Sequence, residues 1–106
     1  ELYRKQIELT VRKSKKTFFE LRKKVKQCAG IRDYYEMSLD EIQRASLLLQ
    51  STVDDCDAAL KYVSRNQRMI PDAKKFANAF LIWQKSMRYQ KKNLDWFMRD
   101  YLGNLQ

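Results

Sequence analysis

Apolar residues recur along most of the chain at alternating steps of three and four, the spacing typical of helices that pack in bundles and coiled coils. Three separate ladders of this kind can be followed, and each predicts one long helix. The first comprises Ile7, Val11, Ser14, Phe18, Leu21, Val25 and Cys28. The second comprises Leu39, Ile42, Ser46, Leu49, Val53, Cys56, Leu60 and Val63. The third comprises Phe76, Phe80, Trp83, Met87, Gln90, Leu94, Phe97 and Tyr101.

Local signals mark where the first helix ends and the second begins. Gly30 follows the first ladder and predicts a left-handed C-cap, so that the helix ends near residue 29. Ser38 and Glu41 form the S-x-x-E pattern of a capping box, with Met37 and Ile42 spaced as its hydrophobic staple. The second helix is therefore expected to start directly after Ser38.

The only proline, Pro71, separates the second ladder from the third. Continuing the second ladder past this point runs out of phase with the third, which favours a turn at about residues 67–71 over a single kinked helix. Gly103 is expected to cap the last helix. The predicted helices span about residues 2–29, 39–67 and 71–102.

Three helices of about 28 to 32 residues, each about 45 Å long, predict an all-α antiparallel three-helix bundle with coiled-coil-like helices, a single domain over residues 1–106. Folding the first helix back about residue 34 or 35 and the second about residue 69 stacks the ladders into layers. The predicted layers are Ser14 with Cys56 and Trp83, Phe18 with Val53 and Met87, and Cys28 with Ile42 and Phe97. This register separates the two cysteines by roughly 20 Å, so both are expected to be free core thiols.

The composition excludes several classes of active site. The chain has no His, two Gly and two Cys, which leaves no His-based triad or metal site, no Gly-rich phosphate loop and no thiolate zinc site. Asp54, Asp55 and Asp57 point in different directions from one helix and are expected to be a solvated face. Gln90 occupies a core position, where a structural hydrogen bond is favoured over ligand binding. An enzyme based on lysine or on a pair of carboxylates would escape these exclusions, but no residue pattern points to one. We therefore expect a non-enzymatic protein with no catalytic, cofactor or metal residues.

The net charge of +9 is unevenly distributed. Residues 1–29 carry ten basic and three acidic side chains, and residues 67–106 carry eight and three. Residues 39–66 carry only three basic and five acidic side chains. An acidic helix between two basic ones lowers repulsion within the bundle, but a large positive excess remains.

Two stripes on the predicted outer faces combine these cations with apolar side chains. The first contains Lys5, Leu9, Arg12, Lys16, Phe19, Lys23 and Lys26. The second contains Ile82, Lys85, Tyr89, Lys92, Trp96 and Arg99. Exposed aromatic residues rimmed by charge mark contact surfaces. The alternative is that the drift of a straight helix, about 20° per heptad, turns some of these residues into the core.

These stripes suggest a protein-interaction or scaffolding module that binds an acidic protein partner or forms a homodimer. Peripheral binding to an anionic membrane is an alternative, and nucleic-acid binding is a second one. Low cysteine usage favours an intracellular location, in the cytoplasm, at a membrane surface or in the nucleus. A chain that begins Glu-Leu-Tyr, without an initiator Met or a signal-like segment, is expected to be part of a larger protein.

In outline, the three long helices resemble a spectrin-type repeat and the helix trio of membrane-bending BAR-type domains, which are normally much longer. The string Met69-Ile70-Pro71-Asp72 is similar to a short stretch of tubulin-binding cofactor A. These likenesses concern shape and four residues, and they assign no family.

Overall fold

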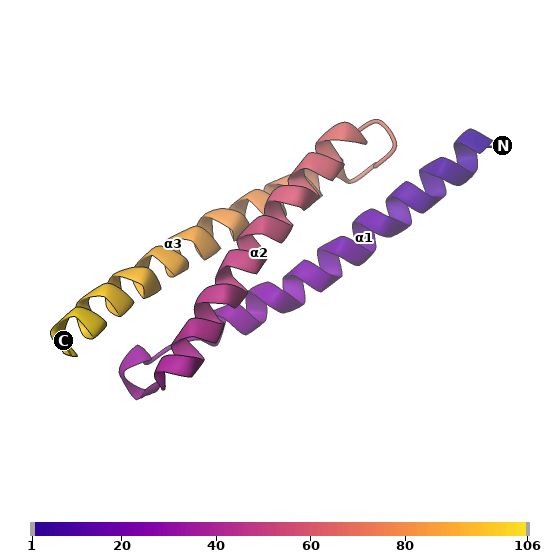
Figure 1. Ribbon diagram of the computed structural model, residues 1–106. Coiled ribbons are helices and arrows are strands. Elements are labelled where there is room, and N and C mark those ends of the chain that lie inside the picture. Colours follow the sequence, from indigo (N-terminus) through magenta and orange to yellow (C-terminus); the bar gives the residue numbers. More distant parts are fainter. Residues whose placement is uncertain (1, 106) are drawn as a thin grey trace.

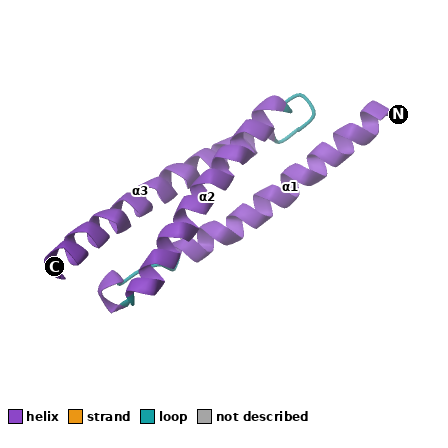
Figure 2. Cartoon of the chain, in the orientation of Figure 1, coloured by secondary structure: helices purple, strands orange, loops and turns teal. Residues whose placement is uncertain are grey.

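The computed structural model describes residues 2–105 and consists of three long helices, as the ladders predict (Figure 1). Helix α1 spans Leu2–Ala29, α2 spans Leu39–Arg65 and α3 spans Ala73–Leu105. A single turn of 3-10 helix, η1 at Tyr34–Glu36, lies in the first connection (Figure 2). The bundle measures 64 × 17 × 17 Å. The all-α antiparallel three-helix fold is confirmed.

Helix α1 ends at the predicted residue but by a different conformation. The N–H of Gly30 donates to Gln27 O at 3.1 Å, and the N–H of Ile31 donates to Cys28 O at 3.0 Å. Such bonds to the third residue back tighten the last turn into 3-10 geometry. The predicted left-handed cap at Gly30 is wrong, and the left-handed residue of this connection is Asp33, with φ 53°.

Ser38 caps α2 as predicted, but the Glu41 carboxylate bonds to the Ser38 hydroxyl, whereas in a capping box it would accept from the Ser38 backbone N–H. The Oγ of Ser38 accepts a hydrogen bond from the N–H of Glu41 at 3.2 Å and lies 3.1 Å from Glu41 Oε1, to which its hydroxyl donates. Met37 is half-buried against the core cluster that contains Ile42, so the hydrophobic staple is also present. These contacts satisfy an N-terminal backbone donor and set the angle at which the chain enters α2.

The second connection is a turn, and the kinked-helix alternative is wrong. Helix α2 ends at Arg65, two residues earlier than predicted, and Pro71 lies among the turn residues before α3. Helix α3 begins at Ala73 and continues through Gly103 to Leu105, so the predicted cap at Gly103 is also wrong. A Cβ at Gly103 would meet nothing within 4 Å, so no close packing requires glycine there.

The register between α2 and α3 is the predicted one. The side-chain amide of Gln84 on α3 donates to the carbonyl of Val53 on α2 at 3.4 Å, which corresponds to folding back close to residue 69. The predicted α2–α3 partners also share core clusters. They are Cys56 with Trp83, Val53 with Met87, and Ile42 with Phe97.

Helix α1 is displaced along α2 from its predicted position. The Sγ of Cys28 lies 3.5 Å from the Oγ1 of Thr52, ten residues beyond Ile42, its predicted neighbour. Ten residues correspond to about 15 Å of helix. Phe18 is displaced in the same direction and contacts aromatic rings of α3 instead of Met87. These rings are Phe76, Phe80 and Trp83, with centroids 5.2 to 6.2 Å away.

The displacement leaves the N-terminal end of α1 without neighbouring helices. The Oγ1 of Thr10 lies 3.8 Å from the Sδ of Met69, which belongs to the α2–α3 connection. The preceding residues 2–9, about 12 Å of helix, therefore extend beyond the rest of the bundle. Figure 1 shows the N-terminal end of α1 projecting past the connection between α2 and α3. Within this overhang every side chain except Ile7 is exposed.

The two cysteines are free and buried, as predicted, but the expected 20 Å separation is wrong. Cys28 touches Thr52, and Thr52 is one helical turn from Cys56. The two thiols therefore belong to neighbouring turns of the α1–α2 contact. Burial, followed in size by the effect of the Asp55 carboxylate, raises the pKa of Cys56 to about 11.

Candidate interaction surfaces

The predicted stripe on α1 lies entirely on the surface. We call it the α1 stripe, and all seven of its members are exposed: Lys5, Leu9, Arg12, Lys16, Phe19, Lys23 and Lys26. Leu9 and Phe19 are 62% and 56% exposed. These two apolar side chains therefore stand among five cations along most of the helix.

The predicted stripe on α3 is exposed as well. This α3 stripe consists of Ile82, Lys85, Tyr89, Lys92, Trp96 and Arg99. Ile82, Tyr89 and Trp96 are 65%, 69% and 59% exposed. The alternative that helical drift turns the stripe residues into the core is wrong, because the buried face of α3 keeps its own line of Phe80, Met87 and Leu94.

Gln90 has the structural role that its core position suggested. Its Nε2 donates to the carbonyl of Cys28 at 2.6 Å. That carbonyl lies in the last turn of α1 and also accepts from the N–H of Ile31 at 3.0 Å, so Gln90 supplies its second hydrogen bond. Gln90 thus ties the end of α1 to α3.

Gln84 is a second amide in the core, more deeply buried than Gln90, which the sequence interpretation missed. It is 3% exposed and also lies 3.5 Å from Asp57 Oδ1 through its Nε2. Gln84 lies four residues after Phe80 and so on the same face of α3, because the buried face of the helix is wider than the strict ladder of core positions. Thr52 and Ala59, each three residues from a ladder position, are buried for the same reason.

The acidic residues of α2 act separately. Asp55 pairs with Lys24 of α1 at 2.6 Å, and the same Lys24 donates to Ser51 Oγ at 2.6 Å. Asp57 pairs with Lys61 at 3.1 Å. The hydrogen bond from Lys61, then that from Gln84, lowers the pKa of Asp57 below its usual value. Over residues 2–105, no group of three metal-ligating side chains converges on one point.

Aromatic side chains close the end of the bundle at the first connection. Tyr35 of η1 packs edge-on against Phe97 of α3 with centroids 4.8 Å apart. Tyr34 lies 5.4 Å from the same ring, and burial raises its pKa. Phe97 stacks in turn on Tyr101 at 5.3 Å. This cluster, absent from the sequence interpretation, fixes the connection to the C-terminal half of α3.

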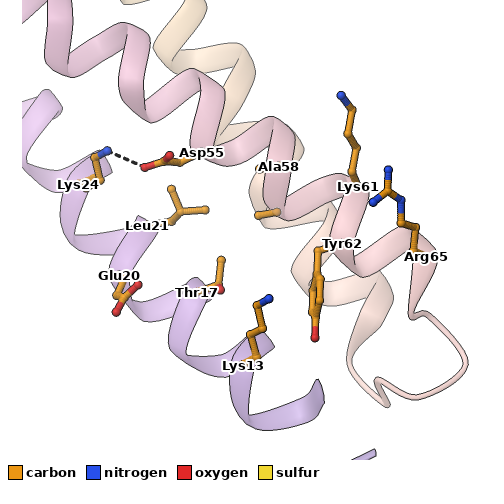
Figure 3. Close-up of a pocket in the computed structure, with 11 residues that line it drawn as sticks. Lys13, Thr17, Glu20, Leu21, Lys24, Asp55, Ala58, Lys61, Tyr62 and Arg65 are labelled. Atoms are coloured by element: carbon orange, nitrogen blue, oxygen red, sulfur yellow. Dashed lines mark hydrogen bonds and ion pairs between the residues drawn. The ribbon is translucent and has the colours of Figure 1, made fainter. Parts of the chain in front are cut away.

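A groove that the sequence did not predict runs between α1 and α2 (Figure 3). We call it the α1–α2 groove, and its volume is about 540 Å³. Its lining is Lys13, Thr17, Glu20, Leu21, Lys24, Asp55, Ala58, Ala59, Lys61, Tyr62 and Arg65. Lys13 of α1 lies over the ring of Tyr62 of α2, with Nζ 4.5 Å from the centroid.

In residues 2–105, none of the helices combines the length and the apolar character needed to span a membrane. No protein-family model matches the chain, and comparisons with curated proteins and with solved structures found no match.

Proposed function

We propose that this chain is a non-enzymatic interaction module, which presents the α1 stripe and the α3 stripe to acidic protein partners. The observation that supports this most is the exposure of Phe19, Tyr89 and Trp96, each more than half accessible and each among cations. Large aromatic side chains dominate the energetics of many protein interfaces once a partner covers them.

The arrangement of charge fits an acidic partner better than a second copy. In the α3 stripe, cations alternate with apolar residues at helical spacing, so a partner helix with acidic residues beside an apolar line would satisfy both. Two α3 stripes facing each other would bring Lys85, Lys92 and Arg99 against the same cations. The net charge of +9 adds to this repulsion.

Charge reversal tests the proposal. The triple variant Arg12→Glu, Lys16→Glu and Lys23→Glu should no longer capture the acidic proteins that bind the α1 stripe in an intracellular pull-down. The double variant Tyr89→Ala and Trp96→Ala should no longer capture the acidic proteins that bind the α3 stripe. A matched control, Arg68→Glu with Lys74→Glu and Lys75→Glu, makes the same change of charge at exposed positions outside both stripes. Equal losses in the control would contradict the proposal, and a dimer in light scattering would favour self-association.

Binding to an anionic membrane is a second candidate, favoured by the two exposed apolar side chains of the α1 stripe. Leu9 and Phe19 are flanked by five cations, each worth about 1 kcal/mol near an anionic surface. Cosedimentation with phosphatidylserine vesicles at low and physiological salt tests this, with a duplex oligonucleotide as the nucleic-acid comparison. If the chain binds neither the vesicles nor the oligonucleotide but still captures acidic proteins in the pull-down, the membrane and nucleic-acid candidates are excluded and the protein partner is supported.

A further inference from the structure

We propose that the α1–α2 groove is a separate binding site for an acidic amphipathic helix, which would lie against α1 and α2 as a fourth helix. This goes beyond the proposed function, because the groove shares none of its lining residues with the two stripes. It lies between helices, whereas each stripe follows the outer face of one helix.

The shape of the groove suits a helix. Leu21 and Ala59, 3% and 5% exposed, form an apolar base, and the exposed methyl of Ala58 lies beside them. Figure 3 shows Thr17 and Leu21 of α1 facing Ala58 of α2, with longer side chains to either side. On α1 the lining runs from Lys13 to Lys24, or about 16 Å, which matches three turns of an added helix.

The charge of the groove suits an acidic ligand at one end. Lys24 is already paired with Asp55, so that end is close to neutral. Around Tyr62 at the other end lie Lys13, Lys61 and Arg65, labelled in Figure 3. Lys61 pairs with Asp57, whereas no carboxylate of residues 2–105 lies within the 4.0 Å ion-pair distance of Lys13 or Arg65.

These features define the occupant. Its apolar face should repeat at steps of three and four to cover the Leu21–Ala59 base, and its carboxylates should be concentrated at the end near Tyr62. A second copy of this chain fits poorly, since its α1 and α3 are basic and its α2 already packs against both. The occupant that we propose is therefore an acidic amphipathic helix from outside residues 1–106, supplied by a partner protein.

A labelled 18-residue helical peptide tests the proposal by fluorescence anisotropy. It carries leucines at i, i+3, i+4 and i+7 and glutamates concentrated at one end. Filling the groove with Ala58→Trp, or reversing charge with Lys13→Glu and Arg65→Glu, should weaken binding at least 10-fold. Circular dichroism would show that each variant keeps its helix content. A composition-matched peptide without the apolar spacing should bind at least 10-fold more weakly than the amphipathic one.

Matched variants separate this site from the stripes. The α3 stripe would require acidic residues along the whole partner helix, whereas the glutamates of this peptide are concentrated at one end. Lys85→Glu with Lys92→Glu makes the same change of charge on the α3 stripe and should therefore leave peptide affinity within about 3-fold. If instead the stripe variant loses the peptide and the groove variants keep it, the groove proposal is wrong and the proposed function is strengthened. The groove proposal would also be overturned if the labelled peptide did not bind at a 100-fold molar excess of the protein. Equal binding of the composition-matched peptide without the apolar spacing would overturn it as well.

Discussion

The α2–α3 pair and helix α1 are held in the bundle by different kinds of contact. Helix α2 buries eight residues, and α3 places Phe76, Phe80, Met87 and Leu94 against it. Helix α1 buries only four residues, Thr10, Ser14, Leu21 and Cys28, although with 28 residues it is slightly longer than α2, which has 27. A helix with small and polar residues at its buried positions gains little from packing, so its place depends on a few specific contacts.

Those contacts are mostly polar and directional. Gln90 bonds the last turn of α1, Lys24 bridges to Asp55 and Ser51, and Lys13 lies over Tyr62. Phe18 supplies the one large aromatic anchor, against the rings of α3. Helices α2 and α3 therefore form a well-packed hairpin, and α1 is attached to this hairpin by fewer buried apolar contacts. The α1–α2 groove lies at this less densely packed contact.

The largest expected effect is the loss of stability when a buried aromatic ring is removed, and it should differ between the α2–α3 hairpin and α1. Phe80→Ala removes a ring that is 0% exposed and should lower the free energy of unfolding by about 3–5 kcal/mol. Phe18→Ala removes a half-buried ring from α1 and should lower it clearly less. Urea denaturation followed by circular dichroism measures both. Equal losses would show that α1 is as firmly packed as the hairpin.

Thiol labelling should show α1 opening before the hairpin unfolds. Both cysteines are 0% exposed, so labelling requires opening. Both thiols share core clusters with α3 residues, but Cys28 lies on α1, whereas Cys56 lies on α2, within the hairpin. Under native conditions Cys28 should therefore react at least about 10-fold faster, which corresponds to about 1.4 kcal/mol. Peptide mass spectrometry of the alkylated protein measures the ratio, and equal rates would indicate a single global opening.

A smaller effect is expected from the amide that ties α1 to α3. Gln90→Leu leaves the carbonyl of Cys28 without that donor and should lower the free energy of unfolding by about 1 kcal/mol. Hydrogen exchange should accelerate in the last turns of α1 and remain unchanged in α2. Gln84→Leu is the matched control, because Gln84 contacts only α2, and its effect should spare α1. Acceleration in all three helices would argue against a local tie.

The smallest effect concerns acid stability. The pKa of Asp57 is lower in the folded chain than its ordinary value of 3.8, so its stabilising contribution is present above that pH. The contribution is lost as the pH falls from 3.8 through the lower folded-state pKa. Asp57→Asn should therefore be slightly less stable than the wild type at pH 6, and the difference should shrink towards pH 2. Thermal unfolding at both pH values measures this, and a constant difference would exclude the titration of Asp57.

The positions of the helices followed from the sequence, whereas the position of α1 along its neighbours did not. The α2–α3 register was predictable because a short turn with Pro71 leaves little freedom in how the helices fold back. A heptad ladder looks alike from one turn to the next, so moving α1 by whole turns still places apolar positions against the pair. The choice among these registers depends on Asp33 and η1, whose conformations no periodic pattern encodes.

The same distinction applies to the surfaces. The α1 stripe and the α3 stripe were predictable, because outer faces are the complement of the buried ladders and do not depend on register. The α1–α2 groove was not, since Lys13 and Tyr62 face each other only in the displaced arrangement. The aromatic cluster around Phe97 was not predictable either, because it forms only when the first connection brings Tyr34 and Tyr35 against α3.

The left-handed backbone at Asp33 has a consequence for how such a protein can change. Asp33 and the 3-10 turn after it determine how far the chain travels before α2 begins, and so act as a spacer that sets where α1 stops. Inserting or deleting residues there would slide α1 along an unchanged hairpin. The groove would then acquire new pairs of facing residues without a substitution in its lining. Length variation in one short connection thus offers a route to new partners that leaves the core intact.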